Sequence, residues 1–100
     1  MMSTELQLPE DVARDLETAT AILKAAGCHA VYVFGSFAAE SHGQDSDLDI
    51  AVEGLPKSLY FKTYGQLLAR LGRDIDLVAL DYDTELAETL RELGPLKRVA

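Results

Sequence analysis

Residues 30–52 read AVYVFGSFAAESHGQDSDLDIAV, and this stretch carries most of what the sequence says about the fold. Its first five residues are small, β-branched or aromatic and stop at Gly35, which predicts a buried strand over residues 30–34. From residue 47 onward polar and apolar residues alternate, which predicts a second strand. The apolar side chains expected on one face of that strand are Leu48, Ile50 and Val52.

The connection between these two strands is short and polar. Ser36 can cap a brief helix that runs through residues 37–40. Residues 41–46 then read as a polar loop around Gly43. Ten residues therefore separate the Gly35-Ser36 pair from the aspartate at position 47.

The sequence on either side adds three helices and a third strand. Apolar residues at steps of three and four predict helices over residues 9–27, 58–71 and 84–93, and residues 74–80 have the composition of a strand. The order is helix, strand, helix, strand, helix, strand, helix. We therefore expect one α/β (α+β) domain over residues 1–100, a small sheet with flanking helices, while the strand directions stay open.

Composition narrows the class of protein. A chain of 100 residues that is 48% hydrophobic can bury one core, and it has no apolar run long enough to span a membrane. Its net charge of −8 would repel a phosphate backbone, so we expect no direct nucleic-acid partner. The first residues do not resemble a signal peptide, and the single cysteine, Cys28, permits no internal disulfide, so we expect a cytoplasmic protein.

Carboxylates on neighbouring strands are the first candidate site. Residues two apart on a strand share a face, so Asp47 and Asp49 project side by side. They are either a solvated strand face or ligands for a hard cation, which prefers carboxylate oxygens. Asp76 adds a third carboxylate if the third strand lies beside the second, although Asp74 shares its face and the pattern alone can select either.

The Gly35-Ser36 pair is the second candidate site. It lies where a strand gives way to a helix, a junction that presents free backbone N–H groups and the positive end of the helix dipole. A glycine lets a phosphate approach the backbone closely, and a serine hydroxyl adds a hydrogen-bond donor. Gly-Ser alone is common, and its spacing to the aspartates makes it informative.

The segment from Phe34 to Val52 resembles the signature of the polymerase-β-like nucleotidyltransferases, in particular the minimal branch encoded beside HEPN-domain proteins. The resemblance implies a mixed sheet with flanking helices and a reaction that transfers AMP from Mg-ATP to a hydroxyl. It implies that Gly35 and Ser36 hold the triphosphate. It also implies that Asp47, Asp49 and Asp76 bind the metal, with two Mg²⁺ ions, and that Asp76 activates the acceptor.

Among minimal members the resemblance further implies an antitoxin that adenylylates a tyrosine of its cognate HEPN toxin. Many relatives carry a basic residue and a glycine after Gly-Ser, whereas this chain has Phe37-Ala38-Ala39-Glu40. Lys57, Lys62 and Arg73 are the cations that could compensate. Two alternatives stay open: an antitoxin that neutralises its partner by binding alone, and an aminoglycoside-type enzyme that modifies small molecules. Assembly as a homo- or hetero-oligomer is also open.

The remaining chemistry-bearing residues fit structural roles. Cys28 and His29 are adjacent, which is not the spacing of a zinc site. His42 lies in the loop between the two halves of the motif, where it could contact substrate, although a loop histidine is more often incidental. We expect the tyrosines at positions 32, 60, 64 and 82 to pack in or around the core.

Overall fold

A computed structural model describes residues 9–35, 48–82, 84–93 and 96–100. In it a four-stranded mixed sheet has helices on both faces. The elements, in chain order, are α1 (Glu10–Ala26), β1 (Ala30–Phe34), β2 (Leu48–Glu53), a 3-10 turn (Lys57–Leu59), α3 (Tyr60–Leu71), β3 (Ile75–Ala79), α4 (Thr84–Leu93) and β4 (Lys97–Arg98). The expected small mixed sheet with flanking helices is confirmed. The brief helix and loop expected between Ser36 and Ser46 lie outside the described residues.

The strand order is β3-β2-β1-β4. β1 pairs antiparallel with β2 and with β4, whereas β2 and β3 are parallel. Parallel strands need a crossover connection, and α3 supplies it between β2 and β3. The strand directions that the sequence pattern left open are therefore mixed.

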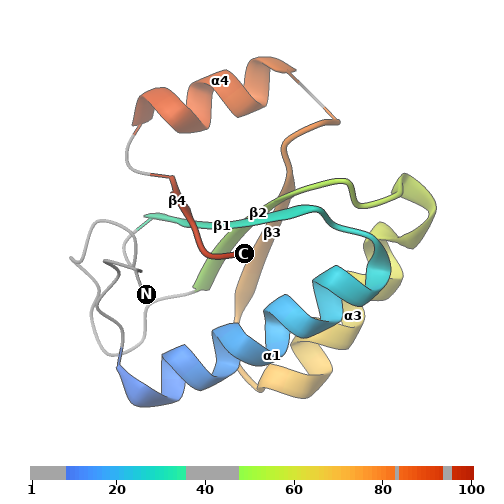
Figure 1. The fold of residues 1–100 in the computed structure, drawn as a ribbon, viewed down its shortest axis with the longest axis vertical. Coiled ribbons are helices and arrows are strands. Elements are labelled where there is room, and N and C mark those ends of the chain that lie inside the picture. The colour runs from blue at the N-terminus through green and yellow to red at the C-terminus, as the bar shows by residue number, and fades with distance from the viewer. Residues whose placement is uncertain (1–8, 36–47, 83, 94–95) are drawn as a thin grey trace.

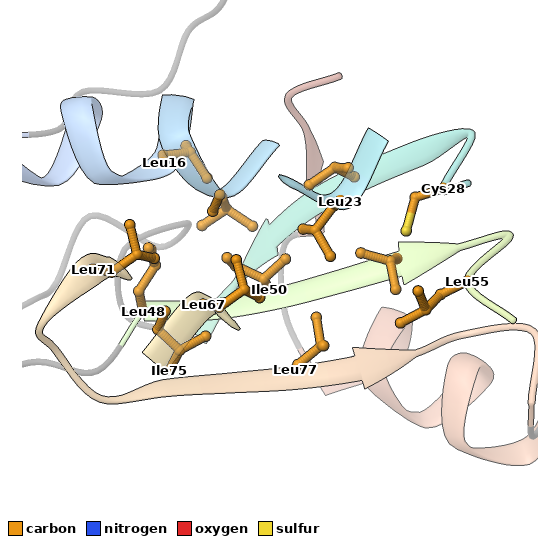
Figure 2. Packing of buried hydrophobic residues seen from close by; sticks show 14 of the residues in the cluster. Leu16, Leu23, Cys28, Leu48, Ile50, Leu55, Leu67, Leu71, Ile75 and Leu77 are labelled. Atoms are coloured by element: carbon orange, nitrogen blue, oxygen red, sulfur yellow. The ribbon is translucent and has the colours of Figure 1, made fainter. Parts of the chain in front are cut away.

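The main core lies between the sheet and the pair α1 and α3, which lie together on one face (Figure 1). From β2 it receives Leu48, Ile50 and Val52, each completely buried, which confirms the alternation expected from the sequence. Figure 2 shows Leu48 and Ile50 among side chains of the two helices and of β3. The helix and β3 residues labelled there are Leu16, Leu23, Leu67, Leu71, Ile75 and Leu77.

A smaller cluster occupies the opposite face, where α4 lies (Figure 1). Its buried members are Ala51, Leu80 and Ala87, one each from β2, the end of β3 and α4. Ala51 is the next residue but one after Asp49 on the same face of β2. Along this face of β2, the carboxylate of Asp49 is therefore followed by Ala51, which packs in the apolar cluster under α4.

Candidate active site

Asp49 and Asp76 lie at the same register on the parallel pair β2 and β3. Neighbouring strands are about 4.8 Å apart, and residues at the same register share a face, so the two carboxylates project side by side. Asp49 is half-buried and Asp76 is exposed at the edge strand of the described sheet. Two carboxylates from adjacent strands thus meet on the face opposite the main core.

The register also separates Asp76 from Asp74. Asp74 comes just before β3, and its backbone carbonyl accepts a hydrogen bond of 3.2 Å from the N–H of Leu48. Its side chain projects two residues earlier along the strand than that of Asp76. Of the two aspartates that the sequence pattern could not distinguish, Asp76 is the one paired in register with Asp49.

Gly35 follows β1 directly and completes the described part of the site. Its φ is +74°, in the left-handed region that side chains disfavour. A Cβ placed there would lie 2.0 Å from Oδ2 and 3.0 Å from Cγ of Asp49. From the sequence, the role expected for Gly35 is to let a phosphate approach the backbone closely. The structure adds a second reason, because the Asp49 carboxylate lies where a side chain at position 35 would be.

Ser36 and Asp47, which the sequence assigned to the same site, lie outside the described residues. Within the described part of the chain, no group of three or more His, Cys, Asp or Glu side chains is arranged to hold a metal ion. The described donor set is therefore the carboxylate pair. Hard divalent cations accept such oxygens, and Mg²⁺ is commonly held by one or two protein carboxylates together with substrate phosphates. The pair fits that mode of binding, and Gly35 is exposed beside it.

The cations that the sequence offered as phosphate ligands have other contacts. Arg73 forms ion pairs with two carboxylates of α1, at 2.6 Å to Asp15 and 3.2 Å to Asp11. The Lys57 ammonium lies 5.5 Å from the centre of the Tyr82 ring. Lys62 lines a groove between α1 and α3, on the core side of the sheet. In this structure the Arg73 guanidinium therefore links the turn before β3 to α1.

Beyond the carboxylates the same face is held by polar contacts near α4. The Tyr32 hydroxyl donates a hydrogen bond of 3.0 Å to Glu53, whose other oxygen lies 3.9 Å from Arg91 of α4. Burial, and then the bond to Glu53, raise the pKa of Tyr32 above its ordinary value. These groups attach α4 to the sheet and are separate from the carboxylate pair.

Cys28 and His29 have structural surroundings, as expected. Cys28 is buried in the main core, and burial, with a smaller contribution from Asp81, raises the pKa of its thiol. His29 is bound through its backbone, its N–H donating to the carbonyl of Glu53 and its carbonyl accepting from Arg98. His42 lies outside the described residues. None of the helices in the described ranges is both long and apolar enough to cross a membrane.

A sequence model of the family described as "Polymerase beta, Nucleotidyltransferase" matches residues 17–93, which include Gly35, Asp49 and Asp76. No curated protein matches the chain. Several solved structures share its fold at 21–24% identity, and three of them follow.

One of these structures is assigned as a minimal nucleotidyltransferase, with 24% identity and a TM-score of 0.68 over 98% of this chain and 99% of that chain. Another is a toxin–antitoxin structure with AMP-PNP, with 21% identity and a TM-score of 0.67 over 90% of this chain and 72% of that chain. The third is a complex of a tri-AMPylated Shewanella oneidensis HEPN toxin with an MNT antitoxin, with 21% identity and a TM-score of 0.64 over 86% of this chain and 69% of that chain.

Proposed function

The chain belongs to the polymerase β nucleotidyltransferase family, and we propose that it transfers AMP from ATP to a hydroxyl group of a partner protein. One observation carries this proposal. The parallel register of β2 and β3 sets Asp49 beside Asp76, and the Asp49 carboxylate occupies the space where a Cβ on Gly35 would lie, at the end of β1. A nucleotide triphosphate and its cation need such a combination of carboxylate oxygens and an accessible backbone turn.

The proposed roles follow from these positions. Asp49 and Asp76, together with Asp47, hold Mg²⁺, with two ions expected from the family. Gly35 and Ser36 bind the triphosphate through the backbone and the serine hydroxyl. When bound, the metal neutralises charge on the phosphates and favours loss of the proton from the attacking hydroxyl. Asp76 is exposed at the sheet edge, so an acceptor hydroxyl can reach it from solvent while Asp49 stays partly covered.

We propose a tyrosine of a HEPN-domain toxin as the acceptor. Two of the similar structures are toxin–antitoxin assemblies, one with the ATP analogue AMP-PNP and one with a tri-AMPylated HEPN toxin. The donor, ATP, and the free thiol of Cys28 are consistent with the cytoplasm.

A second candidate function is neutralisation of the toxin by binding alone. The observation that favours it is the placement of the cations, since Arg73 is paired with α1 and Lys57 lies over Tyr82. A site short of positive charge binds a triphosphate less tightly. The two candidates differ in one measurable product, the covalent AMP.

The test incubates the protein with labelled ATP, Mg²⁺ and the product of the neighbouring gene. We expect label on the partner, lost in Asp49→Asn and in Asp76→Asn. Asp74→Asn is the matched control, because Asp74 is also exposed and lies two residues before Asp76 in the sequence, and this variant should keep the activity. Partner binding without label would favour neutralisation by binding. Loss of label in Asp74→Asn but not in Asp76→Asn would overturn the site.

A further inference from the structure

β3 is an edge strand of the described sheet, and half of its backbone groups face away from β2. The carbonyl of Asp74 accepts from Leu48, and the N–H of Leu80 donates to Val52. Because backbone groups alternate in direction along a strand, even-numbered residues here face β2 and odd-numbered residues face outward. The outward carbonyls are those of Ile75, Leu77 and Ala79.

Two tyrosines of α3 donate to these outward carbonyls. The Tyr64 hydroxyl lies 2.6 Å from the carbonyl oxygen of Ile75, and the Tyr60 hydroxyl donates to that of Leu77. The spacing has a simple origin. Four residues of an α-helix rise about 6 Å, and two residues of a strand rise about 6.6 Å, so side chains one helical turn apart match alternate carbonyls of one strand edge.

The two bonded carbonyls stand on either side of Asp76. The Ile75 carbonyl belongs to the peptide that joins Ile75 to Asp76, so the bond from Tyr64 fixes the peptide plane directly before the aspartate. The bond from Tyr60 fixes the peptide that follows Leu77. Both rings pack against the main core, whereas the Asp76 side chain projects from the other face. The tyrosines therefore act on Asp76 through the backbone and not on a bound nucleotide.

We propose that Tyr60 and Tyr64 are positioning residues whose hydroxyls hold the edge strand β3 in the place that keeps Asp76 beside Asp49. The catalytic consequence rests on the proposed function, while the structural consequence does not. An edge strand bonded on one side only is free to move away from its neighbour, and Asp76 is on such a strand. The hydrogen bonds from the Tyr60 and Tyr64 hydroxyls hold β3 on the side that faces away from β2. They also occupy an edge that would otherwise be open to pairing with another chain.

The test compares Tyr60→Phe/Tyr64→Phe with Tyr82→Phe in the full chain. Tyr82 is a matched control, since its hydroxyl also donates to a backbone carbonyl at 2.6 Å, but to Leu55, outside β3. Amide hydrogen exchange at Asp76 and Val78, whose N–H groups face β2, reports the opening of β3. In the double variant we expect these two amides to exchange roughly tenfold faster when their rates are compared with those of the β1 amides. In Tyr82→Phe we expect the same ratio as in the unmodified protein.

The second readout is binding of Mn²⁺ with ATP, followed by calorimetry, which we expect to weaken several-fold in the double variant only. Equal acceleration of exchange in β1 and β3 would overturn the proposal, because it would mean a general loss of stability. So would faster exchange in β3 with unchanged affinity for Mn²⁺ and ATP. If the unmodified protein bound no Mn²⁺ with ATP, the proposed function would fail, and the exchange data would still decide whether the tyrosines hold β3.

Discussion

Successive residues of β2 point to opposite faces of the sheet, and the two faces differ: one is packed in the main core and the other carries the candidate site. On the face under α1 and α3, Leu48, Ile50 and Val52 are completely buried in the main core. On the other face, Asp49 lies beside Asp76, and Ala51 joins the smaller apolar cluster under α4. Since neighbouring residues of a strand point in opposite directions, a substitution on one face should change stability and one on the other should change binding.

The largest expected effect is on the core face. Ile50→Ala should lower the free energy of unfolding by about 2–5 kcal/mol, because it opens a cavity in a fully packed site. Leu68→Ala is the control, since Leu68 is 43% exposed on α3 and its loss should cost less than about 1 kcal/mol. Urea denaturation measures both. In the folded fraction of Ile50→Ala, affinity for Mn²⁺ with ATP should be preserved, and a loss of that affinity would show that the two faces are not separable.

Gly35→Ala should affect both properties, because Gly35 joins β1 to the carboxylate face. The left-handed φ and the overlap with Asp49 together should cost about 2–4 kcal/mol. Gly72→Ala meets no atom within 4 Å at a similar φ of +66°, so it should show only the backbone cost of about 1–2 kcal/mol. Binding of Mn²⁺ with ATP should fall in Gly35→Ala alone. Equal behaviour of the two variants would contradict the contact between Gly35 and Asp49.

Arg73 tests how the turn before β3 is held to α1. Its ion pair with Asp15 is largely covered, with side chains 22% and 24% exposed, whereas those of the Arg14–Glu10 pair are 71% and 89% exposed. Arg73→Met should therefore lower stability by about 1–3 kcal/mol and Arg14→Met by less than about 0.5 kcal/mol. Thermal unfolding of the two variants at one salt concentration provides the measurement. An equal loss of stability in the two variants would mean that the burial of the Arg73 ion pair does not strengthen it.

The smallest expected effect is at alkaline pH. Burial, followed by the neighbouring Tyr64 and Asp76, raises the pKa of Tyr60 above its ordinary value. A raised pKa in the folded state means that the unfolded chain loses this proton first, so the stabilisation is complete below about pH 10 and is lost as the pH rises further. The Tyr60→Phe variant should lose less stability than the unmodified protein over that range. Urea midpoints measured on either side of pH 10 would show it, and parallel declines would contradict it.

Much of the fold could be predicted from the sequence because it depends on local patterns. The strand β1 and the helix α4 have the predicted boundaries, and α1 ends where the left-handed Gly27 follows it. Helical spacing also predicted the stretch from Ser58 to Leu71, although its first residues form a 3-10 turn after Pro56. The strand β4 was not predicted, because it contains only two charged residues and exists through its pairing with β1.

For the candidate site, the sequence named residues but could not give the contacts between them. Spacing singled out Asp49 and Gly35, and the family resemblance favoured Asp76 over Asp74. The register of β2 and β3 then places Asp76 directly beside Asp49. The approach of Asp49 to Gly35 and the bonds from α3 to the edge of β3 join segments far apart in the sequence. The tyrosines were expected to pack in or around the core, and they do, but their spacing gave no sign of which carbonyls their hydroxyls would reach.

The pairing of Asp49 with Asp76 is the central claim, and binding of Mn²⁺ in the presence of ATP tests it most directly. Calorimetric titration of Asp76→Asn should show affinity reduced at least about tenfold, because a carboxylate ligand is lost, with no loss of thermal stability. Titration of Asp74→Asn should match the unmodified protein. Weaker binding in Asp74→Asn with normal binding in Asp76→Asn, or normal binding in both, would contradict the account.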